Sequence, residues 1–201
     1  MMSRIIVAIA LLCASALVHA DFLGAASGRS ANPANSPKLS IEGTLNNGSG
    51  YRYIGARINY NVNDKVTAYG DFGQADIFGD GISFGGGVFY YLPGVSESMS
   101  FMNNMDAAVQ ASLHIADLFV DYTAITAALL VSPKTPLANG MYWYANAGLF
   151  NVNSGSGVPG PGGFELQVGG GISLPLGPGT LFAGLDRIGQ FTASVGYRFA
   201  L

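Results

Sequence analysis

The feature of this sequence that most constrains its fold is an alternation of apolar and polar residues with a period of two. It is clearest at the end of the chain, FTASVGYRFAL, where odd positions from Phe191 to Leu201 are apolar or aromatic. Thr192, Ser194, Gly196 and Arg198 lie between them. Successive side chains of a β-strand point to opposite faces, so the pattern predicts a strand with one apolar and one polar face. The apolar face could be turned inward, as in a soluble barrel, or outward into lipid.

The alternation recurs from residue 37 onward, between clusters of turn residues such as NNGSG at 46–50 and GPGT at 177–180. This spacing favours antiparallel hairpins. The segments predict ten strands, at residues 37–46, 51–62, 65–75, 81–92, 106–115, 118–131, 140–152, 163–176, 180–186 and 190–201. Most reach the roughly 9–11 residues that a transmembrane strand needs. The ninth is short and residues 186–189 form only a weak turn, so eight strands are the alternative. We expect an all-β, closed, antiparallel, up-and-down transmembrane β-barrel.

One segment fits two structures. Residues 117–131, DLFVDYTAITAALLV, favour a helix by their Ala and Leu content and a strand by their Val, Ile, Thr and Tyr content. Asp121 would lie inside any membrane-spanning helix, and the run is short for one. We therefore expect a strand here, with a helix as the alternative.

The beginning of the chain has the composition of a secretory signal peptide. Arg4 supplies the positive charge, residues 5–17 form a short apolar run, and Val-His-Ala at 18–20 fits a cleavage site. Cys13 is the only cysteine, so the exported chain would have none, which excludes a disulfide scaffold. The expected organisation is a signal peptide at 1–20, a flexible N-terminal lead-in at 21–36 and the transmembrane β-barrel at 37–201.

The scarcity of charge decides which face meets lipid. Charged residues are 10% of the chain, against about 25% in typical soluble domains, and no basic patch indicates nucleic acid. The polar face of each predicted strand carries only one or two charges, which suits a narrow lumen behind a lipid-facing apolar exterior. The polar, inward face is expected to carry Glu42, Arg57, Asn59, Thr67, Asp71, Gln110, Ser112, His114, Asp121, Thr123, Glu165, Gln167, Ser194 and Arg198.

The chain resembles a small outer-membrane β-barrel protein of the broad OmpA/OmpX/opacity class of Gram-negative cells. The resemblance is carried by the signal peptide, the alternating strands, ISFGGGVFYYL at 82–92 and GYRF at 196–199. It implies a place in the lipid of the cell outer membrane and handling by the barrel assembly machinery during biogenesis. It also implies that Tyr197 and Phe199 are the aromatic positions of the C-terminal assembly signal. We expect a monomer.

The inward ionisable residues predict a network of paired charges in the lumen. A lone buried charge is costly, whereas paired and hydrogen-bonded charges are tolerated. With inward tyrosines, the network would occlude the lumen, so we expect a structural or surface-interaction role without catalysis or cofactor. The alternatives are a narrow, porin-like channel for small or apolar solutes and, last, an outer-membrane lipid hydrolase. The expected network consists of Glu42, Arg57, Asp71, Asp121, Glu165 and Arg198.

The hydrolase alternative would rest on His114, with Ser112 and Asp121 on the same predicted face. In such an enzyme the base must reach the nucleophile, but Ser112 and His114 would lie about 7 Å apart along one strand. Packing in the lumen is the preferred interpretation. One histidine and no cysteine after the expected cleavage site also leave no cluster of metal ligands.

Glycine triplets at 85–87 and 169–171 lack the Lys-Ser/Thr of a phosphate-binding loop. Inward glycines would instead make room for bulky neighbours in the lumen. The expected bulky lumen residues are Tyr69, Phe89, Tyr91, Tyr142 and Tyr144, and the expected outward aromatic residues are Tyr90, Tyr122, Trp143, Tyr197 and Phe199.

Overall fold

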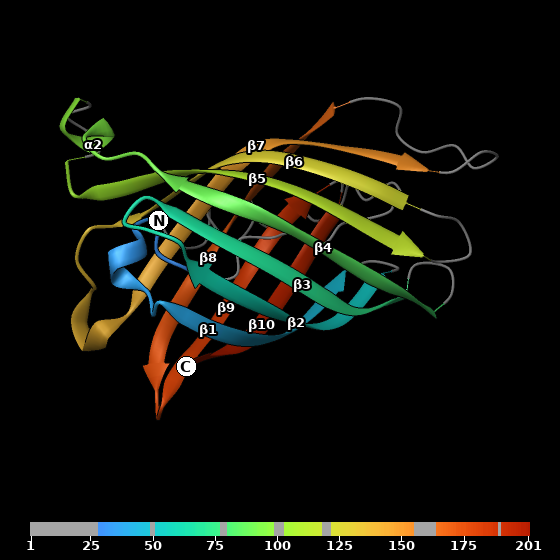
Figure 1. The fold of residues 1–201 in the computed structure, drawn as a ribbon, viewed down its shortest axis with the longest axis horizontal. Coiled ribbons are helices and arrows are strands. Elements are labelled where there is room, and N and C mark those ends of the chain that lie inside the picture. Colours follow the sequence, from blue (N-terminus) through green and yellow to red (C-terminus); the bar gives the residue numbers. More distant parts are fainter. Residues whose placement is uncertain are drawn as a thin grey trace, which may run out of the picture.

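Ten antiparallel strands close into a barrel in the computed structural model, which describes residues 28–48, 51–76, 80–98, 103–117, 122–154, 164–188 and 190–201. Each strand pairs with its neighbours in sequence, and β1 pairs with β10 to close the wall (Figure 1). The predicted closed up-and-down barrel is confirmed, with ten strands rather than eight. The strands are β1 (Leu39–Gly48), β2 (Tyr51–Asn61), β3 (Val66–Asp76), β4 (Asp80–Tyr91), β5 (Met105–Asp117), β6 (Tyr122–Pro133), β7 (Tyr142–Ser154), β8 (Phe164–Leu176), β9 (Gly179–Ile188) and β10 (Gln190–Ala200).

The helical segments that the structure describes are short. They are the 3-10 turns η1 (Pro33–Asn35) and η3 (Ala138–Gly140) and the single-turn helix α2 (Val95–Ser98). Within the described ranges, no helix has the length and apolar character needed to cross a membrane. The N-terminal end of the described chain, the C-terminus and α2 lie toward one end of the barrel (Figure 1). An even number of up-and-down strands returns the chain to the end where it started. The predicted signal peptide at 1–20 lies outside the described residues.

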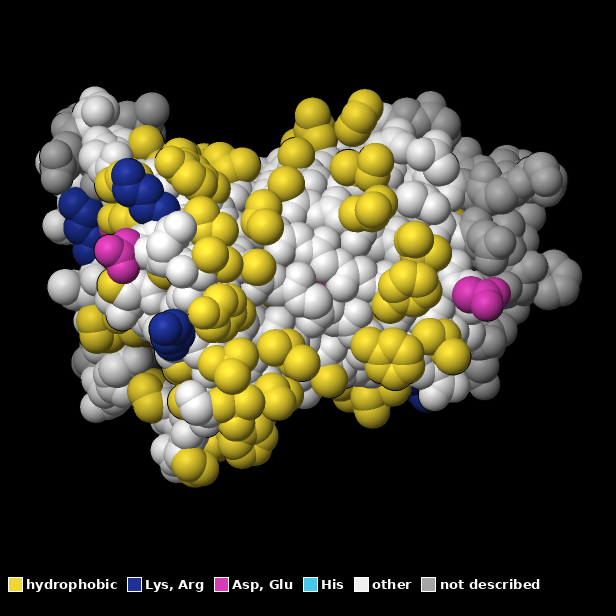
Figure 2. Space-filling model, in the orientation of Figure 1, with side chains coloured by type: hydrophobic (Ala, Val, Ile, Leu, Met, Phe, Trp, Pro, Cys, Tyr) yellow, Lys and Arg dark blue, Asp and Glu magenta, His cyan; other side chains and the backbone are white. Residues whose placement is uncertain are grey.

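The wall has an apolar exterior and a polar interior. Ile54, Phe72 and Leu185 point outward and are about 60% exposed (59%, 61% and 59%), whereas the inward Gln110 and Gln167 are 0% exposed. Figure 2 shows hydrophobic side chains spread over the wall, with charged side chains near its two ends. A soluble barrel has the opposite arrangement, and this one is the architecture of an outer-membrane-type barrel.

Strand β6 corrects the prediction for residues 117–131. The helix alternative is wrong for the described part, which is the strand Tyr122–Pro133. The inward face assigned through Thr123 is also wrong, because Tyr122 is 7% exposed inside the barrel and Ile125 is 49% exposed outside. Alanine, threonine and leucine occupy both faces of this segment, so its pattern does not set the register, and pairing with β5 does. A slip of one residue exchanges the faces, which places Tyr122 in the lumen rather than in an outer aromatic girdle.

The connection between the last two strands also differs from the prediction. A weak turn was expected at residues 186–189, but β9 continues to Ile188 and pairs with β10 from Gln190 onward. Asp186 therefore lies on the inner face of β9 and is 1% exposed. The odd-numbered residues of β9 point outward. This alternation of faces in the sequence could have placed the even-numbered Asp186 in the lumen.

The orientation of the wall predicts the effect of a charge on its outer face. Leu113 lies near the middle of β5 and is 49% exposed. An arginine on the lipid face at the bilayer midplane costs about 2–4 kcal/mol. We expect Leu113→Arg to lower the free energy of unfolding in lipid vesicles by about that amount, measured by denaturant titration. Leu113→Ala is the matched control and should cost clearly less; equal effects would contradict a lipid-facing exterior.

Candidate functional site

A single row of inward residues runs around half of the barrel wall. Each member is the register partner of the next, across six adjacent strands. Along the first four positions the charge alternates in sign, so every charged side chain has an opposite charge beside it. The row is Arg198 on β10, Glu42 on β1, Arg57 on β2, Asp71 on β3, Gly85 on β4 and His114 on β5.

Two ion pairs and a histidine contact hold this row together. Arg198 Nε donates to Glu42 Oε1 at 2.5 Å. Arg57 donates to Asp71 Oδ2 from Nη2 at 2.9 Å and from Nε at 3.2 Å. His114 Nε2 lies 3.0 Å from the Asp71 carboxylate. Asp71 thus joins a guanidinium on one side to an imidazole on the other.

These groups lie almost entirely out of contact with solvent. Glu42 is 0% exposed, and Arg57 and Arg198 are each 6% exposed. Removing an ion from water is costly unless opposite charge and hydrogen bonds replace the water. Asn59 Nδ2 donates to Glu42 Oε1 at 2.9 Å, and the Arg57 guanidinium lies 4.3 Å from the centre of the Tyr69 ring. The row is therefore a network in which neighbouring groups compensate one another.

The structure brings together four of the six residues predicted for the network, Glu42, Arg57, Asp71 and Arg198. Glu165 lies half-buried on β8 and forms no ion pair with any residue that the structure describes. Asp121 lies outside the described residues.

Glycines allow the large inward side chains to lie flat against the wall. A Cβ atom at Gly85 would overlap the His114 ring, so this glycine lets His114 reach across β4 to Asp71. A Cβ atom at Gly171 would likewise approach the Tyr144 hydroxyl to 2.7 Å. The prediction that inward glycines make room for bulky lumen residues is confirmed at these positions.

The described chain before β1 enters the lumen beside the charged row. Arg29 is 3% exposed, donates from Nη1 to Asn59 Oδ1 at 2.5 Å, and lies 5.0 Å from the centre of the Phe89 ring. Arg198 Nη1 lies 3.5 Å from the carbonyl oxygen of Gly28. Arg29 precedes the first strand. Burial lowers the pKa of its guanidinium and the nearby Arg198 guanidinium lowers this pKa further, whereas the Glu42 carboxylate raises it. Arg29 is a lumen cation that sequence analysis missed, because residues 21–36 show no period.

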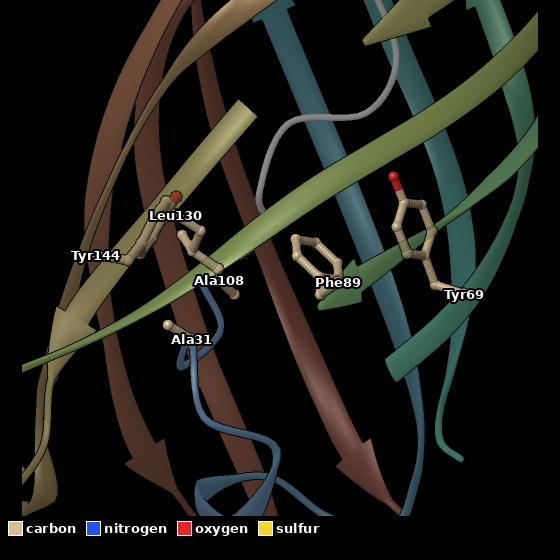
Figure 3. Packing of buried hydrophobic residues seen from close by; sticks show 6 residues of the cluster. All are labelled: Ala31, Tyr69, Phe89, Ala108, Leu130 and Tyr144. Carbon is tan, nitrogen blue, oxygen red and sulfur yellow. The ribbon is translucent and has the colours of Figure 1, made fainter. Parts of the chain in front are cut away.

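Further contacts hold this segment along its length. Ser132 Oγ on β6 accepts the backbone N–H of Ala31 at 2.9 Å and lies 3.3 Å from Ser30 Oγ. Asn61 Nδ2 on β2 donates to the carbonyl oxygens of Pro33 at 3.0 Å and Pro37 at 3.1 Å. Figure 3 shows Ala31 inside the barrel, in a cluster of buried residues. In the described part of the predicted lead-in, residues 28–31 and Pro33 are thus buried in the barrel, whereas Ala34 and Asn35 are exposed. The cluster comprises Ala31, Tyr69, Phe89, Ala108, Leu130 and Tyr144.

The geometry around the histidine does not form a nucleophile and base pair. Ser112 Oγ is buried and forms no hydrogen bond with His114, whose Nε2 is turned toward Asp71. Both side chains lie in the packed interior, at 7% and 0% exposure.

The two residues predicted for the C-terminal assembly signal lie together near the end of β10. Phe199 points outward and is 47% exposed, and its ring centre lies 4.6 Å from that of Tyr197. The Tyr197 hydroxyl donates to the carbonyl oxygen of Leu176 on β8. The pair forms an aromatic patch on the outer surface at the end of the barrel where the chain terminates.

Comparison with solved structures finds matches at low sequence identity. The β-domain of the Bordetella autotransporter BrkA matches with 13% identity and a TM-score of 0.43, over 81% of this chain and 98% of that one. A membrane protein from a study of in-meso crystallization matches with 11% identity and a TM-score of 0.37, over 80% of this chain and 83% of that one. No family model and no curated protein matches the chain.

The Glu42–Arg198 pair predicts a strong coupling across the β1–β10 seam. Removing one partner of a buried pair typically costs about 3–5 kcal/mol, because the other charge is left uncompensated. We expect Arg198→Met to lower the free energy of unfolding in detergent micelles by about that amount. The double variant Glu42→Gln with Arg198→Met should cost less than the single arginine change. A double-mutant cycle by denaturant titration measures this, and additive effects would mean that the two groups do not compensate each other.

Proposed function

We propose that this protein is a closed barrel of the bacterial outer membrane with a structural or surface-interaction role and no catalytic activity. The observation that carries the proposal is the occupied lumen, which holds a compensated charge row and an N-terminal segment bound both to the charged side, through Asn59, and to β6, through Ser132. A ten-stranded barrel has only a narrow interior, and large inward side chains fill much of it. The apolar exterior supports residence in lipid. Kinship with the OmpA/OmpX/opacity class stays a prediction.

A porin-like channel is the second candidate, and one observation favours it. Residues 28–36 are joined to the wall by hydrogen bonds and packing, so the segment can leave without breaking any strand pairing. A lipid hydrolase has weaker support, because Ser112 and His114 form no hydrogen bond to each other and lie out of reach of bulk solvent.

The occluded lumen predicts the electrical behaviour of the protein. We expect the purified wild-type protein to show little or no steady conductance in planar bilayers. Deleting residues 21–36 removes the inserted segment and should raise the conductance or the frequency of openings. Large, stable conductance of the wild type would overturn the closed barrel and favour the channel.

A disulfide provides the matched control for this deletion. Ser30 Oγ and Ser132 Oγ lie 3.3 Å apart, so the pair Ser30→Cys and Ser132→Cys should lock the segment in the lumen when oxidised. Any openings of the wild type should disappear in the oxidised pair and return on reduction. If openings persist in the locked protein, the segment does not control them.

We further propose that Tyr197 and Phe199 are read by the outer-membrane barrel assembly machinery. Their outward position near the end of β10 supports this, because an inserting factor can reach them. Tyr197→Ser with Phe199→Ser should lower the amount of protein in the outer-membrane fraction, as judged by immunoblot, and raise its degradation.

Phe191→Ser is the control for this variant, because Phe191 is also outward on β10, at its opposite end, and is 37% exposed. It should leave the outer-membrane level much less changed. Normal levels of the double variant would show that these aromatic residues are not the signal, and recovery of the wild type as a soluble protein would contradict the proposed location.

A further inference from the structure

The wall opposite the charged row carries a second polar cluster that the proposed function does not use. It lies on β7, β8 and β9, where Asn146, Gly169 and Asp186 are successive register partners. Gln167 is the next inward residue of β8 beside Gly169. Asp186 is 1% exposed, Gln167 0% and Asn146 5%.

The polar atoms of this cluster are only partly satisfied. Asn146 Nδ2 donates to Asp186 Oδ1 at 3.0 Å. Asp186 Oδ2, Asn146 Oδ1 and both polar atoms of Gln167 are buried without a hydrogen-bond partner. Among the residues that the structure describes, no cation forms an ion pair with Asp186. A buried carboxylate without compensation is costly, so it must take up a proton or a cation.

The arrangement favours a cation over a proton. A protonated Asp186 could donate to only one of the two neighbouring amide oxygens, leaving the other unpartnered. A cation can be coordinated by the carboxylate and by both amide oxygens, and water bound to it can accept from Gln167 Nε2. Gly169 lets the Asp186 and Asn146 side chains lie against β8, because a Cβ atom there would overlap Asp186 Oδ1 and lie 3.1 Å from Asn146 Oδ1.

The charge and ligand types indicate which cation fits. Carboxylate and amide oxygens are hard ligands of the kind that alkali and alkaline-earth ions prefer. The cluster carries one negative charge, which a monovalent ion balances. Sites for divalent ions usually hold more carboxylates, and no group of three or more His, Cys, Asp or Glu that could hold a metal occurs in the described ranges. We propose that Asn146, Gln167 and Asp186 form a binding site for a monovalent alkali cation in the barrel wall.

The test compares cations of different size at constant ionic strength and pH 8. The wild-type protein in detergent should unfold at a higher temperature in sodium or potassium chloride than in choline chloride, whose cation is too large for the site. Asp186→Asn keeps the shape of the side chain and removes its charge, so this difference should be lost. Glu165→Gln is the matched control on the neighbouring strand and should retain it. Equal melting temperatures of the wild type in all three salts, or a difference that persists in Asp186→Asn, would overturn the proposal.

A second measurement does not depend on any variant. Crystals of the wild-type protein grown with thallium(I), which substitutes for potassium, should show an anomalous scattering peak among the side-chain oxygens of Asn146, Gln167 and Asp186. A water-sized feature without anomalous signal would assign the site to water beside a protonated carboxyl group, and would also overturn the proposal.

Discussion

Closure of the wall between β1 and β10 is the constraint on which the rest of the structure depends. In hydrocarbon, an open sheet edge would leave backbone N–H and C=O groups unpaired at a cost of several kcal/mol each. The pairing runs from Ser40 opposite Ala200 to Gly48 opposite Thr192, so the two ends of the strand-forming chain hold each other. Closure also places Glu42 opposite Arg198, which are 156 residues apart in the chain. The charged row can be complete only when the barrel is closed.

Inward side chains have little space inside a narrow barrel. Each large inward ring requires a small neighbour, and glycine supplies it at Gly85 for His114 and at Gly171 for Tyr144. Gly85 also removes a side chain that would otherwise separate His114 from Asp71. Composition and electrostatics are therefore linked, because a glycine that weakens β4 also permits the buried contact between His114 and Asp71.

Buried polar and charged groups are compensated differently on the two sides of the lumen. On β10 and β1–β3, opposite charges lie beside each other and compensate directly. The inserted N-terminal segment adds a further cation, Arg29, to this side of the lumen. On β7–β9, Asp186 has an amide neighbour in Asn146 but no paired cation among the described residues. The inserted segment reaches both the charged side, through Asn59, and β6, through Ser132. The charges of the charged row thus compensate one another, whereas the charge of Asp186 has to be compensated by a group other than the neighbouring side chains.

The sequence by itself determined the class of fold and most of the inward face, because side-chain alternation is a local property and closure in lipid is obligatory. It favoured ten strands and left eight as the alternative, and the structure has ten. It placed Glu42, Arg57, Asp71 and Arg198 inward, and all four belong to the charged row. Only the tertiary structure decided which charges meet, since strand register depends on pairing between distant segments. For the same reason the faces of β6 and the position of Asp186 were wrongly assigned where the pattern was weak. Residues 28–36 have no period, so their place was decided only by tertiary contacts, among them those of Arg29 with Asn59 and of Ala31 with Ser132.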